Sequence, residues 1–120
     1  MPSIVGKISK FTKREIEYLF SHARRIVRGQ ACTVLMSPRQ GEFGRVLIIA
    51  SRKVGNAPER NLVRRRIKSI FYEEKLFQQG FDFVVIVYKK AVTLPFEQLK
   101  DLLLAAYRKG SNATEDSISQ

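Results

Sequence analysis

The 120-residue sequence has no tryptophan, one cysteine and one histidine, and it is poor in acidic residues. The lone Cys32 excludes an internal disulfide and suits a reducing compartment, so we expect a cytoplasmic protein. Cys32 lies in a predicted strand and is interpreted as a small core residue. No apolar run approaches the roughly 20 residues that cross a bilayer, and residues 1–10 lack the apolar segment of a signal peptide.

Catalytic motifs are also missing. The chain contains no C-x-x-C, no H-E-x-x-H and no P-loop glycine pattern. The only histidine, His22, stands near Arg24 and Arg25 without a nearby acid, which is typical of a surface residue rather than a base. We therefore expect neither catalytic side chains nor a metal site in the protein. In a catalytic assembly, its role would be to bind and position a polyanion.

Basic residues, in contrast, are abundant. The chain has 22 Lys and Arg against 11 Asp and Glu, a formal net charge of +11 and a pI near 10.2. This balance indicates nucleic acid or an anionic membrane as the partner. A membrane is the weaker interpretation because the cations cluster around one turn and one helix, without a broad exposed apolar face beside them.

The cations concentrate between Ser51 and Phe71, a stretch with seven Lys or Arg and a single acid, Glu59. A helix is predicted from Asn56, which can cap it; Pro58 is tolerated in the first turn, and Glu59 completes a capping box. At about 100° per residue, one face collects polar and basic residues: Arg60 at its edge, Asn61, Arg64, Arg65, Lys68, Tyr72 and Lys75. A solvated surface helix would mix charge signs, so this face is interpreted as anion-binding.

The remaining segments predict one domain over 1–120, with residues 1–10 loose and 110–120 a disordered tail. The predicted elements are a helix over 12–22 opened by a capping box, strands over 25–28, 31–37 and 45–51, a helix over 56–79, a strand over 81–88 and a helix over 95–108. The segment 38–44 reads as a hairpin loop, and the apolar run 46–50 suggests a strand buried on both faces. This order predicts an α+β, two-layer α/β sandwich with a mostly antiparallel sheet.

The motif over 51–68 resembles the protein subunit of bacterial ribonuclease P, and the similarity extends over about residues 8–109. The residues that match the family motif are Ser51, Arg52, Lys53, Gly55, Ala57, Arg60, Asn61, Arg64 and Arg65. The resemblance implies an α-β-β-β-α-β-α fold with a four-stranded sheet, similar to the second domain of ribosomal protein S5, and a left-handed βαβ crossover.

The resemblance also implies a function. Such proteins assist a catalytic RNA that removes the 5′ leader of precursor tRNA, so the activity is that of an endoribonuclease whose chemistry belongs to RNA. Magnesium is implied as the cofactor, bound mainly by RNA, and the protein is expected to be monomeric before assembly, without DNA or membrane partners. The implied RNA-binding residues are Arg52, Lys53, Arg60, Asn61, Arg64, Arg65 and Lys68. The implied leader groove comprises Ile16, Phe20 and Val34.

Three positions depart from the family pattern. Leu62 replaces an arginine of the basic motif, and Ile16 and Val34 stand where aromatic residues are common. Three alternatives stay open: a ribosomal or other structural RNA-binding protein, a DNA-binding regulator and a protein-only nuclease. The regulator is disfavoured because a strand, not a helix, precedes the basic helix, and the nuclease because no acid cluster is present.

Overall fold

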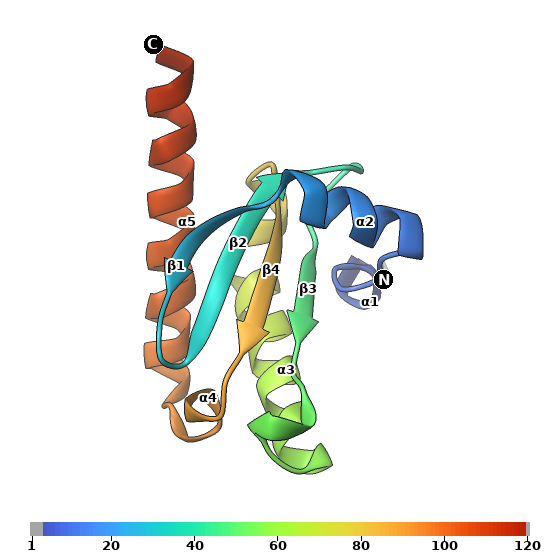
Figure 1. Cartoon of the computed structure of the whole chain (residues 1–120), viewed down its shortest axis with the longest axis vertical. Helices are drawn as coiled ribbons and strands as arrows, with labels where there is room; N and C mark the ends of the chain where they lie inside the picture. Colours follow the sequence, from blue (N-terminus) through green and yellow to red (C-terminus); the bar gives the residue numbers. More distant parts are fainter. Residues whose placement is uncertain (1–3, 120) are drawn as a thin grey trace.

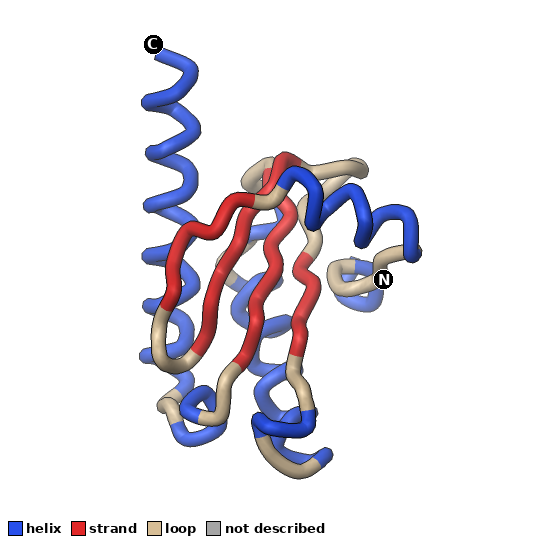
Figure 2. The backbone as a smooth tube through the Cα atoms, viewed as in Figure 1, coloured by secondary structure: helices blue, strands red, loops and turns tan. Residues whose placement is uncertain are grey.

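The computed structural model describes residues 4–119 (Figures 1 and 2). Its elements are α1 Ile4–Lys7, α2 Lys13–His22, β1 Arg24–Arg28, β2 Cys32–Pro38, β3 Val46–Ile49, η1 Arg52–Val54, α3 Ala57–Glu73, η2 Leu76–Gln78, β4 Phe81–Val87, α4 Lys90–Thr93 and α5 Phe96–Ser119. The predicted α-β-β-β-α-β-α order is confirmed, with short helices added at α1, η1, η2 and α4.

The four strands form one mixed sheet in the order β1-β2-β4-β3. β1 pairs with β2 and β2 with β4 in antiparallel fashion, whereas β3 pairs with β4 in parallel. Along the chain, α3 connects the parallel strands β3 and β4, and in Figure 1 it runs behind the sheet. This placement makes the crossover from β3 to β4 left-handed. Nearly all such connections are right-handed, so this topology is distinctive, and it agrees with the fold that the resemblance implied.

The prediction of a hairpin over 38–44 is wrong. β4 lies between β2 and β3, so this segment crosses the start of β4 instead of joining neighbouring strands. The buried carboxylate of Asp82 accepts hydrogen bonds from the backbone N–H groups of Gln40 (3.3 Å) and Arg45 (2.9 Å), which fixes both ends of the crossing. Gly44 is needed for close approach, because a Cβ there would lie 2.1 Å from the Phe81 carbonyl oxygen.

The main core lies between the sheet and the two long helices α3 and α5, which both lie behind the sheet in Figure 1. Phe71 of α3 meets Phe83 of β4 edge to face, with ring centroids 5.3 Å apart. The apolar run 46–50 is not buried on both faces as predicted, because β3 is an edge strand and its residues Leu47, Ile48 and Ile49 are only partly buried.

Both chain ends depart from the prediction. Ile8 is packed rather than loose: it is fully buried, and its carbonyl accepts a 2.7 Å hydrogen bond from Val46 N–H at the start of β3. Residues 1–3 lie outside the described residues.

At the other end, α5 continues past the predicted stop at Arg108 and through the predicted disordered tail to Ser119, and Gln120 lies outside the described residues. Gly110 is a packing residue and not a helix stop. A Cβ at this position would come within 2.3 Å of the Met36 sulfur, so glycine lets α5 approach β2 closely.

Candidate RNA-binding surface

The face of the sheet opposite α3 and α5 is only partly covered. Besides the buried pair Ser37 and Asp82, strand alternation places two rows that cross all four strands on it. The first row comprises Arg25, Leu35, Val84 and Leu47, and the second Arg28, Thr33, Ile86 and Ile49. α2 lies at the end of this face where β3 and β4 start (Figure 1), and Leu19 of α2 and Val84 of the first row are both fully buried. Ile86 and Ile49 in the second row stay partly exposed, which leaves a shallow apolar surface beside the helix.

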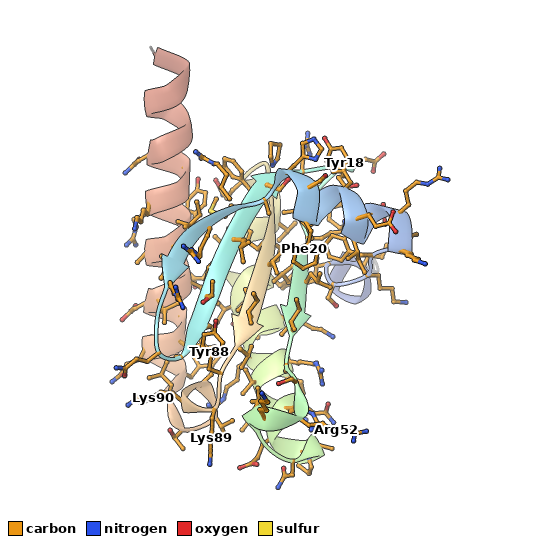
Figure 3. All side chains as sticks on the ribbon, in the orientation of Figure 1. Tyr18, Phe20, Arg52, Tyr88, Lys89 and Lys90 are labelled. Atoms are coloured by element: carbon orange, nitrogen blue, oxygen red, sulfur yellow. The ribbon has the colours of Figure 1, made fainter. Side chains whose placement is uncertain are left out.

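Phe20 and Ile16 of α2 border this open face. Phe20 is 45% exposed, so it is not a core residue, and Ile16 is partly buried. Figure 3 shows Phe20 on the sheet side of α2 and Tyr18 at its outer side. Tyr18, 44% exposed, instead stacks on His22 with ring centroids 3.9 Å apart. The structure therefore brings together two of the three residues predicted for the leader groove.

Val34, the third, does not belong to the groove. It pairs with Val85, is fully buried and belongs to the core beneath α3 and α5. The prediction assigned Val34 to the wrong face of the sheet. Side chains alternate along a strand, so neighbouring residues lie on opposite faces. The neighbours Thr33 and Leu35 face the open side instead.

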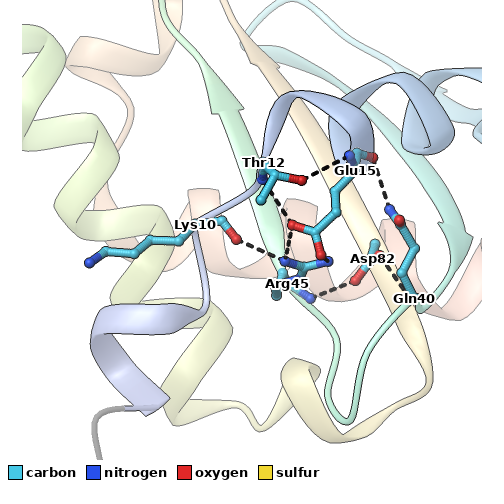
Figure 4. A network of polar contacts seen from close by, with 6 residues as sticks. All are labelled: Lys10, Thr12, Glu15, Gln40, Arg45 and Asp82. Atoms are coloured by element: carbon cyan, nitrogen blue, oxygen red, sulfur yellow. Dashed lines mark hydrogen bonds and ion pairs between the residues drawn. The ribbon is translucent and has the colours of Figure 1, made fainter.

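A polar network fixes the N-terminus of α2 on the sheet (Figure 4). The guanidinium group of Arg45 donates to both carboxylate oxygens of Glu15, at 3.0 and 3.2 Å, and to the carbonyl of Lys10 at 2.9 Å. It also lies over the Phe11 ring, 4.3 Å from the centroid. Glu15 closes the predicted capping box with Thr12. One acid thus caps the helix and ties it to the start of β3.

The environment of this network shifts the pKa values of Glu15 and Asp82 in opposite directions. The hydrogen bonds from Arg45 and from the Thr12 amide lower the pKa of Glu15 from 4.5 to about 2. Burial raises the pKa of Asp82, against the smaller opposing effect of its hydrogen bond from the Arg45 amide. Neither Arg45 nor Asp82 was among the predicted site residues. The isolated acid in the apolar strand F-D-F-V-V was the available clue, because a buried acid needs partners.

Lowering the pH is expected to weaken the fold through Glu15. Its pKa is about 2 in the folded protein against 4.5 ordinarily, so the unfolded chain binds the proton first. The stabilisation is complete above about pH 4.5 and is lost as the pH falls toward 2. Melting temperatures of Glu15→Gln should therefore fall less across this window than those of the parent. Glu17→Gln, an exposed acid on the same helix, should keep the parent's slope, and equal slopes for all three proteins would contradict the assignment.

The predicted basic helix is confirmed as α3. Asn56 caps it and Glu59 completes the capping box, each through a 2.9 Å hydrogen bond. Arg60 donates to the Gly55 carbonyl at 2.9 Å, and Arg64 to the Ala50 carbonyl just beyond β3 at 3.4 Å. These bonds hold two guanidinium groups at the junction of η1, β3 and α3.

The other predicted RNA-binding residues surround this junction. Asn61 and Arg65 are exposed on α3, and Lys68 is partly exposed one turn further on. Arg52 and Lys53 are exposed in η1, which leads into the helix, and Figure 3 places Arg52 beside α3. We call the seven residues the basic surface: Arg52, Lys53, Arg60, Asn61, Arg64, Arg65 and Lys68.

Arg66 is turned away from the basic surface. Its guanidinium group donates to the Leu94 carbonyl at 3.2 Å, between α4 and α5, so it does not stand in for the arginine that Leu62 replaces. Leu62 is partly exposed on the outer side of α3. The basic surface therefore lacks the cation that the resemblance implied at position 62, and Arg66 does not supply it.

Metal-ligating side chains are dispersed in the part of the chain that the structure describes. No three of His, Cys, Asp or Glu are grouped there in an arrangement that could hold a metal ion. Nor does any helix among the described residues have the length and apolar character to cross a membrane. The two features that stand out are thus the basic surface and the open face of the sheet.

Comparisons with known proteins identify the family of this chain. The family model described as Ribonuclease P matches residues 11–110. The ribonuclease P protein component of Petrotoga mobilis is 30% identical over 102 residues, covering 81% of this chain and 86% of that protein. The component from Bacillus velezensis is 42% identical over 77 residues, covering 64% and 66%.

Solved structures agree with the sequence relatives. The ribonuclease P protein from Thermotoga maritima superposes with a TM-score of 0.67 at 25% identity and covers 81% of this chain and 92% of that one. The Staphylococcus aureus protein has the same fold, with a TM-score of 0.70 at 20% identity and coverage of 84% and 93%. This chain therefore belongs to the bacterial ribonuclease P protein family, the protein components of the endoribonuclease that processes tRNA.

Proposed function

We propose that this protein component binds the ribonuclease P RNA through the basic surface and holds the 5′ leader of precursor tRNA on the open face beside α2. The observation that carries the proposal is that the two surfaces adjoin. Arg64 of the basic surface donates to the Ala50 carbonyl, one residue past the end of β3, and β3 forms the edge of the open face. A leader on the sheet would thus lie next to an RNA bound at α3.

The chemistry of the two surfaces suits two different RNA partners. Guanidinium groups fit phosphate oxygens of a folded RNA, and a protein of net charge +11 releases condensed counterions when two polyanions meet. The open face is apolar and carries the exposed ring of Phe20. Stacking tolerates any base, so such a face suits an unpaired leader of variable sequence.

The proposal also concerns the magnesium of the holoenzyme and the cellular compartment of the protein. Since the described acids form no cluster, we assign the magnesium of the holoenzyme mainly to RNA oxygens, and the protein lowers the repulsion that the metal would otherwise screen. The only cysteine, Cys32, is a buried free thiol, in keeping with assembly in the reducing cytoplasm. We expect a monomer that joins one RNA.

The direct test is the magnesium requirement of cleavage. A bacterial ribonuclease P RNA is assayed on precursor tRNA over a magnesium series, with and without the protein, and the protein should shift half-maximal cleavage to lower magnesium. A ribosomal protein of similar size and charge serves as the control for unspecific neutralisation. An equal shift with both proteins would contradict a specific role, and no shift would remove the proposed function.

A further inference from the structure

A hollow of about 350 Å³ lies at the end of the open face remote from Phe20. We propose that it binds one unpaired nucleotide of the leader, with the base against Tyr88 and the backbone phosphate between Lys53 and Lys89. The proposal rests on the leader path proposed above and adds a second anchoring point to it. The residues that line the hollow are Ile49, Ser51, Lys53, Val54, Ile86, Val87, Tyr88 and Lys89.

Tyr88 is held in place although its ring is exposed. Its hydroxyl group and the Thr33 hydroxyl oxygen lie 2.7 Å apart in a hydrogen bond, and its backbone N–H donates to the Ala31 carbonyl at 2.9 Å. Thr33 is buried, whereas Tyr88 remains 39% exposed. A ring fixed at its far end loses little conformational freedom when a base stacks on it, which favours binding.

The walls of the hollow match the parts of a nucleotide. Ile49 and Ile86, from adjacent parallel strands, give it an apolar floor. Lys53 from η1 and Lys89 after β4 bring ammonium groups, and no carboxylate is among the residues that line it. Its volume is near the lower end for small-ligand pockets, so a single base fits better than a longer segment. Lys53 also belongs to the basic surface, so in our proposal the hollow lies where the leader meets the catalytic RNA, whereas Lys89 belongs to the hollow alone.

The hollow is continuous with the open face. Ile49 and Ile86 belong to the cross-strand row next to the one beneath α2, so they continue the apolar surface on which Phe20 lies. Figure 3 shows Phe20 beside α2 and Tyr88 near the end of β4, with Lys89 following Tyr88. A leader that crosses the sheet along β4 would meet an aromatic ring at each end.

The test places the fluorescent base 2-aminopurine at successive leader positions of precursor tRNA and binds each substrate to the holoenzyme. Stacking quenches this fluorophore, so the parent should show two quenched positions. Tyr88→Ala should restore fluorescence at one and Phe20→Ala at the other. Tyr88→Ala should also weaken affinity for the full-length leader by roughly fivefold to a hundredfold, the range of one base–aromatic stack. Tyr88→Phe keeps the ring and should stay within about threefold of the parent.

Further variants separate the possible failures. Tyr18→Ala removes a ring of similar exposure outside the groove and should leave both positions quenched. Lys89→Ala tests the hollow without touching Tyr88 or the basic surface, and should weaken leader binding too. If Tyr88→Ala leaves both leader positions quenched, as Tyr18→Ala should, while Phe20→Ala restores fluorescence at one position, then the hollow is not a leader site. The groove beside Phe20 would still bind the leader. Should neither position respond, the leader path fails as well. An equal loss of affinity for the catalytic RNA without substrate would assign the hollow to that RNA and overturn our proposal.

Discussion

Replacing Phe20 with alanine is expected to weaken binding of precursor tRNA by the holoenzyme about fivefold to a hundredfold, because one base–aromatic stack contributes roughly 1–3 kcal/mol. Affinity for mature tRNA should be nearly unchanged, since mature tRNA has no leader. Binding of the protein to the catalytic RNA should be unchanged too, because that interaction is assigned to the basic surface. Equilibrium titrations with precursor and mature tRNA measure the difference directly.

The structure supplies a matched control for this variant. Tyr18→Ala removes a ring of nearly equal exposure, 44% against 45%, from the same helix but from its outer side. It should bind both tRNAs like the parent. If Phe20 were a core residue, its truncation would cost about 3–5 kcal/mol of stability; at 45% exposure we expect a much smaller change in melting temperature. Equal losses for precursor and mature tRNA in a protein that melts normally would contradict a leader contact.

Arg64→Ala together with Arg65→Ala is expected to weaken binding to the catalytic RNA by tenfold or more, because hydrogen bonds to charged groups contribute about 1.5–3 kcal/mol each. The dependence of log K on log salt should become shallower by about 0.7–0.9 for each RNA phosphate that the variant no longer neutralises. Filter binding of the labelled RNA at several salt concentrations gives both quantities from one experiment.

A second pair of cations controls for net charge in this measurement. Arg108→Ala with Lys109→Ala removes the same charge from exposed positions on α5. If position on the basic surface matters, this control should bind almost as the parent does, with nearly the parental salt slope. Similar slopes for both double variants would show that only total charge is being sensed, and the basic surface would lose its assignment.

Local patterns in the sequence predicted the helices whose first residues form a recognisable capping motif. The capping boxes Thr12/Glu15 and Asn56/Glu59 predicted the starts of α2 and α3, because the cap and its partner lie three residues apart in the chain. The basic side of α3 followed from helical periodicity alone. Strand order did not, because nothing local in 38–44 shows that β4 later inserts between β2 and β3.

The site was predictable to the same extent. The resemblance assigned Phe20 to the leader groove, and the structure leaves its ring exposed beside the open face. Val34 was assigned to the wrong face, because the apolar residues of its strand do not show which side faces the core. Gly110 reads as a helix stop in sequence and packs on Met36 in space. The position of Tyr88 depends on a hydrogen bond to Thr33, 55 positions away, which no short-range pattern reveals.

The position of β3 at the edge of the sheet has a consequence for the protein before it meets RNA. An edge strand presents unpaired backbone groups that can recruit the same strand from another copy, the first step toward aggregation. Here the Ile8 carbonyl occupies the amide of Val46 at one end, and the Arg64 guanidinium group lies on the Ala50 carbonyl at the other. Between them lie three partly exposed apolar residues, Leu47, Ile48 and Ile49. If RNA binds both adjoining surfaces as we propose, it would cover this gap, and assembly of the ribonucleoprotein would also protect its protein from self-association.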